Sequence, residues 1–156
     1  MNFNEVLKKK AADIERPPIL PPGTYLMQVA KAPALDSKSS DKGNWDTLDF
    51  TLLPVAAMED VDPELLAAYG PFTPAASQRV TFMFDKDNQT NFDRTLFNLK
   101  RFLLDHLQIP GGEESALKEL LDQCVGLQCQ AFIRWDPDKN DPEIQYPRIV
   151  RTAAAT

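Results

Sequence analysis

Residues 47–52, Thr47-Leu48-Asp49-Phe50-Thr51-Leu52, alternate strictly between polar and apolar side chains. Successive side chains of a β-strand point to opposite faces, so this run predicts a strand with one buried and one solvated face. We expect the strand to extend from about Trp45 to Leu53, with Leu48, Phe50 and Leu52 in the core.

Four further segments carry strand signals, and they lie on both sides of this run. The first is Thr24 to Ala32, where Tyr25, Met27 and Val29 share one face. The others are Arg79 to Phe84, Leu127 to Trp135 and Gln145 to Thr152. Alternation places Tyr25, Phe50, Val80, Phe82 and Phe84 in the core. Polar clusters at 36–44 and 136–142 predict the turns of two hairpins.

Three segments carry helix signals. Residues 62–70 begin with Asp62 as N-cap and Pro63 at the first helical position, and they stop at Gly70. The clearest helix follows Thr90 as cap; its apolar residues recur at helical spacing, and Ile109-Pro110-Gly111-Gly112 ends it. These apolar residues are Phe92, Leu96, Leu99, Phe102, Leu103 and Leu107. A shorter helix spans about Ser115 to Cys124.

Three strands, a helical segment and two more strands predict an α+β fold, mainly β with helices. We expect a five-stranded OB-like barrel with a helical insertion between strands 3 and 4. A β-sandwich of similar content is the main alternative. The expected organisation is an extended N-terminal arm at 1–22, the barrel domain at 23–152 and a tail at 153–156. The arm combines a short helix near Phe3, Val6 and Leu7 with a proline-rich extended segment at 16–22.

Composition limits the functional classes. The chain has 156 residues, 43% of them hydrophobic, and a formal charge of −6. This negative charge disfavours sequence-independent binding of duplex nucleic acid, which requires a basic surface. A local basic groove beside aromatic side chains would still suffice for a single strand. Its apolar stretches are too short to cross a bilayer and Met1 to Glu5 does not resemble a signal peptide, so we expect a cytoplasmic protein without a membrane partner. Cys124 and Cys129 are expected to be small buried side chains, with a disulfide as the alternative.

The sequence favours a protein that is not an enzyme. His106 is the only histidine, and late on an amphipathic helix it is expected to be structural. Asp136, Asp138 and Asn140 imitate the start of a calcium loop, but Asp141 stands where that loop needs glycine and Pro147 where it needs glutamate. We therefore expect no catalytic residues, no metal and no cofactor.

Candidate binding residues combine aromatic faces with nearby cations, as single-strand binding requires. They lie on the two predicted hairpins: Lys38, Lys42, Trp45, Phe132, Arg134, Trp135, Tyr146, Arg148 and Arg151. Phe132 and Arg134 share a face with Gln128 and Gln130, which is not a core composition. The alternative is that this face is merely solvated and that Trp45 and Trp135 belong to the core.

The order of several short motifs resembles a family of small bacteriophage proteins. These motifs are Leu20-Pro21-Pro22-Gly23-Thr24-Tyr25, Leu48-Asp49-Phe50-Thr51-Leu52, Leu99-Lys100-Arg101-Phe102-Leu103, Val125-Gly126-Leu127 and Tyr146-Pro147-Arg148-Ile149-Val150-Arg151. The family consists of OB-fold, single-stranded-DNA-binding-like proteins of phage DNA replication and recombination. The resemblance covers roughly residues 20–152 and implies a non-catalytic protein that coats single-stranded DNA without sequence preference.

Two hypotheses follow. In the first, the protein is a phage-type single-stranded-DNA-binding protein of the host cytoplasm. In the second, it is a virion structural protein, a capsid cement or connector subunit, whose residues 1–22 clamp a neighbour. The arm is in either case the expected contact with a second copy or with another phage protein.

Overall fold

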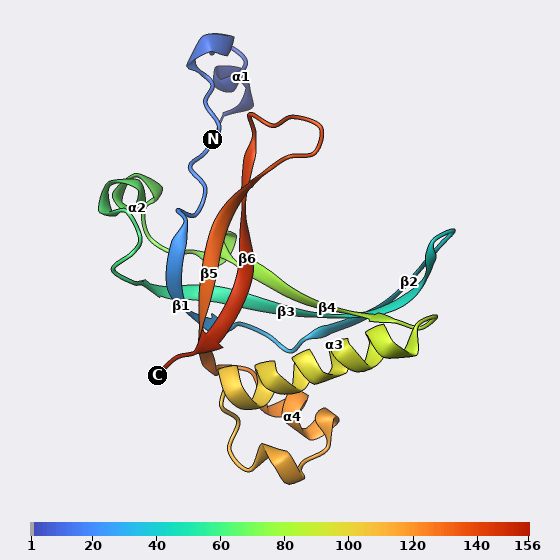
Figure 1. The fold of residues 1–156 in the computed structure, drawn as a ribbon. Coiled ribbons are helices and arrows are strands. Elements are labelled where there is room, and N and C mark those ends of the chain that lie inside the picture. Colours follow the sequence, from blue (N-terminus) through green and yellow to red (C-terminus); the bar gives the residue numbers. More distant parts are fainter. Residues whose placement is uncertain (1) are drawn as a thin grey trace.

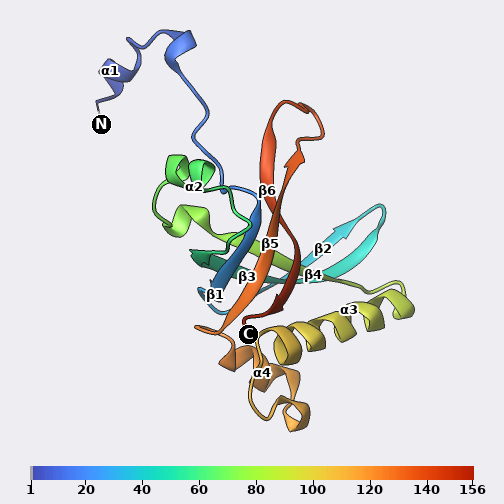
Figure 2. The ribbon, with the colours of Figure 1, turned by 60° about the vertical axis from the view of Figure 1, so that its left-hand side comes forward.

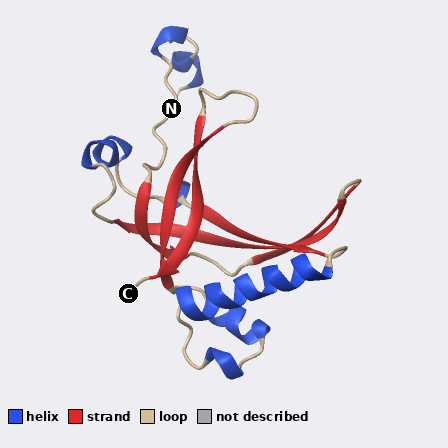
Figure 3. Ribbon diagram, in the orientation of Figure 1, coloured by secondary structure: helices blue, strands red, loops and turns tan. Residues whose placement is uncertain are grey.

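The computed structural model describes residues 2–156 and has an α+β fold built on one antiparallel sheet of six strands (Figures 1 and 3). The strands are β1 (Gly23–Val29), β2 (Ala34–Ser40), β3 (Gly43–Ala57), β4 (Gln78–Asp85), β5 (Gln128–Pro137) and β6 (Gln145–Ala154). The helices are α1 (Phe3–Val6), α2 (Pro63–Tyr69), α3 (Gln89–Arg101) and α4 (Leu117–Gln123). A π-helical turn, Phe102–His106, extends α3, and short 3-10 turns occupy Ala11–Asp13, Pro74–Ala76 and Gly112–Glu114.

The long strand β3 organises the sheet. Its first half pairs with β2 and its second half with β1, so these two strands follow one another along one side of β3. On the other side of β3 lies β4, and beyond β1 the sheet continues through β5 to β6. No pairing joins β4 to β6 among the described residues, so the sheet stays open between these two strands. The α+β class is thus confirmed, whereas the expected closure into a barrel is not observed.

Strand β2 was not expected, because it occupies most of the predicted turn at 36–44. Only Asp41 and Lys42 form the turn, and residues 34–40 pair in register with 43–49. All seven residues of β2 are exposed, so hydrophobic burial does not drive this pairing. The backbone groups of β3 accept a partner strand whatever its side chains are, which overrides the turn propensity of Asp36, Ser37 and Ser39.

Strand β3 is also longer than predicted, because it runs through Pro54. The register of the β1–β3 pair shifts there: Leu26 pairs with Ala56 and Met27 with Pro54, which leaves Val55 as an extra residue. Proline has no amide hydrogen to give to a neighbouring strand and is tolerated in sheets at such irregularities. The bulge therefore explains how a proline can lie in a central strand.

The predicted core is confirmed in its main elements. Tyr25, Met27, Phe50 and Leu52 are fully buried, and Leu99, Phe102, Leu103 and Leu107 of the α3 segment pack in the same cluster. Helix α3 is capped by the Asn88 side chain, which accepts a hydrogen bond from the Asn91 amide 3.1 Å away, and not by Thr90. Cys124 and Cys129 are buried free thiols at a helix end and in a strand.

The predicted arm divides into two parts, apart from Met1, which lies outside the described residues. Leu20 and Pro21 are buried against the domain, and the carbonyl of Leu20 accepts a hydrogen bond of 2.8 Å from the Trp135 indole. Residues 2–15 are nearly all exposed and project beyond the domain, whereas Arg16, Pro17 and Pro18 lie against it (Figures 1 and 2). The arm is therefore anchored at its C-terminal end only.

Candidate nucleic-acid interface

A groove of about 770 Å³ lies where the sheet is open, between β4, the α3 segment and β6. We call it the seam groove. Its lining residues come from three separate parts of the chain: Arg79, Val80, Thr81 and Phe82; Asn98, Arg101, Phe102 and His106; and Arg148 to Thr152. Four of them are arginines and none is a carboxylate, in a chain whose formal charge is −6. The groove is therefore a local site of positive charge.

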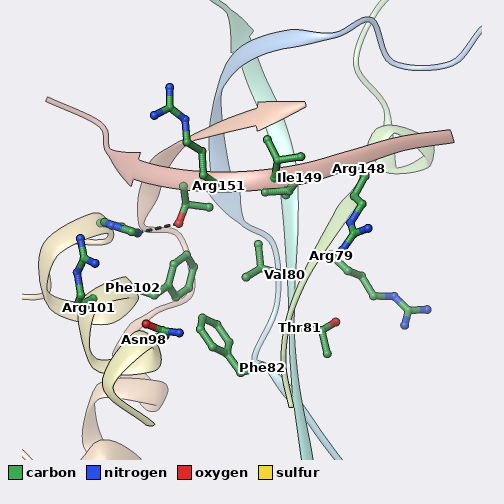
Figure 4. A pocket seen from close by; sticks show the side chains of 13 residues that line it. Arg79, Val80, Thr81, Phe82, Asn98, Arg101, Phe102, Arg148, Ile149 and Arg151 are labelled. Atoms are coloured by element: carbon green, nitrogen blue, oxygen red, sulfur yellow. Dashed lines mark hydrogen bonds between the residues drawn. The ribbon is translucent and has the colours of Figure 1, made fainter. Parts of the chain in front are cut away.

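The floor of the seam groove is apolar, while the arginines stand around it (Figure 4). Phe82 and Phe102 lie with their ring centroids 5.6 Å apart, and Val80 and Ile149 complete the apolar centre. Phe82 is half-buried, so part of its ring remains accessible. In Figure 4, Arg101 stands on the helical side, whereas Arg79 and Arg148 occupy the opposite end.

The four arginines differ in how far their charge is already neutralised. Arg148 lies 3.5 Å from Asp136, and Arg101 lies 3.8 Å from Asp105 with both side chains mostly exposed. Neither Arg79 nor Arg151 takes part in any ion pair of the described residues. Arg151 instead lies over the Phe132 ring, with its guanidinium carbon 4.0 Å from the centroid. Because exposed ion pairs contribute little, Arg148 and Arg101 remain able to exchange their carboxylate for another anion.

A bulge in β6 determines where two of these arginines lie. Ile149 pairs with Ile133 and Arg151 pairs with Phe132, so Val150 is an extra residue without a partner. Without the bulge, Arg148 and Arg151 would point to opposite faces, since they are three positions apart. With it, both lie on the face of β5 and β6 that carries Phe132 and Arg134.

The structure thus brings together five of the predicted binding residues on one surface. We call it the outer face: Phe132, Arg134, Tyr146, Arg148 and Arg151. It is partly occupied by contacts within the chain. Arg134 donates to Asp136 over 2.6 Å, which raises the pKa of the guanidinium and lowers that of the carboxyl, and Arg16 lies 4.8 Å from the Tyr146 centroid.

Lys38, Lys42 and Trp45 lie elsewhere, on the hairpin of β2 and β3, which points away from the hairpin of β5 and β6 (Figure 1). Trp45 is half-buried and pairs with Lys38 on one side and Asp85 on the other. Asp87 also reaches this hairpin, where its carboxylate accepts a hydrogen bond of 2.9 Å from the Asn44 amide. The two lysines therefore lie in a mixed-charge region, and the stacking role of Trp45 stays a prediction.

Trp135 has a different environment from the other candidates. It adjoins Arg16 to Ile19 of the arm and Leu65 and Ala68 of α2 in a small hollow, and its indole donates to Leu20. Its half-buried ring therefore holds the arm to the domain and lies outside the core cluster, so the role of Trp135 in binding stays a prediction.

His106 joins the helical side of the seam groove to β6. Its Nδ1 lies 2.7 Å from the Thr152 hydroxyl oxygen, and burial, followed by the charge of Arg101, lowers its pKa. The imidazole is half-buried and contacts the Thr152 hydroxyl, so it ties the helical side of the groove to β6.

Arg79 and Arg101 were missed by the sequence reasoning. The available signal was the position of Arg79 just before Val80, Phe82 and Phe84, which places it on the solvated face. Its proximity to Arg148 and Arg151 depends on β4 and β6 approaching each other, and that is a property of the whole sheet. Within residues 2–156 there is no cluster of three or more potential metal ligands, and no helix long and apolar enough to span a membrane.

Comparisons with known proteins add no family: no protein-family model matches the sequence, and no curated protein is significantly similar to it.

Proposed function

We propose that the protein is a non-catalytic, sequence-independent single-stranded-DNA-binding protein of phage replication and recombination, and that the seam groove and the adjoining outer face form its DNA site. The observation that carries this proposal is the groove with four arginines and no carboxylate in an acidic chain. Arginines beside accessible aromatic rings are the combination that binds phosphates and stacks bases of a single strand.

The order of the strands supports an OB-type interpretation of the fold. In the OB order, three strands form a meander, a helix follows, and the first strand of the final hairpin pairs with the first strand of the meander. Here β1 and β2 together take the place of the first OB strand, β3 and β4 complete the meander, and β5 of the final hairpin pairs with β1. Closure would require β4 to pair with β6, and these strands flank the seam groove. On this interpretation the protein is an OB-like barrel with one open seam.

The charges favour a single strand over a duplex. A duplex presents a dense phosphate surface that calls for an extended basic face, whereas the arginines here are confined to one groove and the neighbouring outer face. We expect bases to contact the Phe82 and Phe132 rings while phosphates contact Arg79, Arg101, Arg148 and Arg151. No hydrogen bond to a base edge is needed, so the expected binding is independent of sequence.

The experiment is a salt titration of binding to a fluorescent thymidine oligomer, followed by anisotropy. We expect the Arg79→Ala/Arg148→Ala variant to bind more weakly and to show a flatter dependence of log K on log salt. Loss of two phosphate contacts should reduce the slope by about 1.4, since each contact on a single strand contributes ~0.7.

Arg94→Ala is the matched control, because Arg94 is an exposed arginine of α3 that does not line the groove. It should leave the slope unchanged. Equal effects of the two variants, or an absence of oligomer binding by the wild-type protein at low salt, would contradict the proposal. A duplex competitor of the same length should displace the oligomer poorly.

The second candidate function is that of a virion structural protein, a cement or connector subunit. It is favoured by the projecting part of the arm, where Phe3, Leu7 and Ile14 expose large apolar side chains. Failure of the oligomer to bind, together with stable association of the protein with phage particles, would support it.

A further inference from the structure

The projecting part of the arm is amphipathic and has little to hold it. Phe3 and Leu7, one helical turn apart at α1, are 70% and 66% exposed, and three lysines at 8–10 follow them. The hydrogen bonds recorded for residues 2–14 are local. None of the ion pairs of the described residues includes Lys8, Lys9 or Lys10. Apolar side chains displayed next to a cationic run are typical of a segment that docks elsewhere.

A second hollow, of about 450 Å³, lies between α3, α4 and the turn at 112–114, and we call it the α3–α4 groove. Leu96, Leu104 and Leu117 line it, together with Phe97, a surface residue that is 57% exposed. Its charged lining residues are Asp93, Glu113 and Lys100. Two adjoining hollows add Asp105, Glu114 and Arg101, so around this apolar groove the carboxylates of Asp93, Asp105, Glu113 and Glu114 outnumber the cations Lys100 and Arg101.

We propose that the α3–α4 groove of one molecule binds the arm of a second copy, with Phe3 and Leu7 in the groove and Lys8 to Lys10 against its carboxylates. Both halves of this contact have the required chemistry: a short apolar edge meets an apolar groove, and three cations meet an acidic rim. This is the helix-in-groove mode of peptide recognition.

The positions of the two halves make the contact intermolecular. The projecting arm and the α3–α4 groove lie at opposite ends of the molecule in both views (Figures 1 and 2). The arm leaves the domain beside β6, where Arg16 donates to the carbonyl of Gln145 and its guanidinium covers Tyr146. An arm fixed at that end of the molecule reaches the α3–α4 groove of a neighbouring copy more readily than the groove of its own molecule.

A contact between two different surfaces is heterologous, so it repeats from copy to copy in a chain or a ring. Each copy keeps its seam groove, because neither the arm nor the α3–α4 groove contains a lining residue of the seam groove. Only Arg101 lines both the seam groove and the hollow beside the α3–α4 groove. The assembly does not depend on the proposed DNA binding, and it would also serve the virion alternative.

Sedimentation velocity over a range of protein concentrations tests the proposal. We expect the wild-type protein to sediment faster as its concentration rises, and less so at high salt because charges contribute. The arm variant Phe3→Ala/Leu7→Ala and the groove variant Phe97→Ala/Glu113→Ala should each remain monomeric, with an apparent Kd raised by at least about tenfold. All four side chains are exposed, so folding should persist, and circular dichroism checks this.

Mixing the two variants provides the decisive measurement. The arm variant retains a working groove and the groove variant retains a working arm, so an equimolar mixture should form a one-to-one dimer that cannot grow further. Leu35→Ala is the matched control, because Leu35 is an 80% exposed leucine on β2 outside both surfaces. Its sedimentation should match that of the wild type.

Three outcomes would overturn the proposal: a wild-type protein that stays monomeric at every concentration, an arm variant that assembles like the wild type, or a mixture that stays monomeric. The oligomer-binding assay described above is independent of these outcomes, so failure of the arm contact is distinguishable from failure of the DNA site.

Discussion

At the scale of single residues, the two tryptophans show how far alternation can be trusted. The sequence places Trp45 and Trp135 near hairpins and suggests the same role for both. The structure separates them, because Trp135 donates to Leu20 and packs on the arm, whereas Trp45 lies near carboxylates. Neither environment follows from the residues next to the tryptophan in the sequence. That of Trp135 depends on a contact 115 positions away, and that of Trp45 depends on the pairing with β4.

The role of Trp45 can be measured in the Trp135→Phe variant, because the chain has only two tryptophans. Asp85 pairs opposite Trp45 and Asp87 binds the adjacent Asn44 amide, and their charge opposes a phosphate backbone, so we expect a bound thymidine oligomer to quench the Trp45 fluorescence only weakly. Strong quenching would place the hairpin of β2 and β3 inside the interface. The wild-type protein under identical conditions is the reference.

His106 is expected to make stability depend on pH in a defined window. Burial lowers its folded pKa from the ordinary value of 6.5, so the unfolded chain takes up the proton first as pH falls. The contribution of neutral His106 is fully present above 6.5 and is lost as pH falls towards the folded pKa. Urea unfolding at about pH 7.5 and about pH 5.5 should therefore show a smaller free energy of unfolding at the lower pH.

The His106→Gln variant provides the comparison, since glutamine does not titrate. Carboxyl groups such as those of Asp60 and Asp136, whose pKa is lowered, titrate below this window. A variant that loses as much stability as the wild type between the two pH values would show that His106 is not responsible.

At the scale of elements, patterns that depend on burial were predicted better than patterns that depend on pairing. Helix α3 and the buried faces of β1 and β3 follow from apolar periodicity, and they are confirmed. Strand β2 has no buried residue and could not be found this way. The π-turn after α3 could not be predicted from the sequence pattern either. It is defined by a hydrogen bond of 2.8 Å that the Leu107 amide donates to the Phe102 carbonyl.

Helix α3 should be a principal support of the core. Leu99 is 3% exposed and lies in the central cluster, so Leu99→Ala should lower the free energy of unfolding by about 2–5 kcal/mol. Arg94→Ala on the same helix is the control, because its side chain is exposed and lies outside the α3–α4 groove. Denaturant unfolding measures both, and a loss below about 1 kcal/mol for Leu99→Ala would mean that the helix is loosely packed.

At the scale of the whole molecule, the sequence predicts individual binding residues but not the site that they form. Arg148 and Arg151 were predicted from their place on the last strand, and they do line the seam groove. Arg79 and Arg101 reach the same groove from β4 and the α3 segment, far away in the sequence. Their meeting depends on how the sheet curves and where it stays open, which no local pattern records.

The extra residue Val150 means that the charge of this groove depends on the pairing register of β6 as well as on residue identity. Deletion of Val150 would leave Arg148 and Arg151 two positions apart on a regular strand and still on one face, whereas pairing of residues 148–151 without the bulge would turn them to opposite faces of β6. A lineage could thus lose this basic surface through a substitution that abolishes the bulge while every arginine is kept. Two such proteins would differ in binding while their residue compositions remained almost the same.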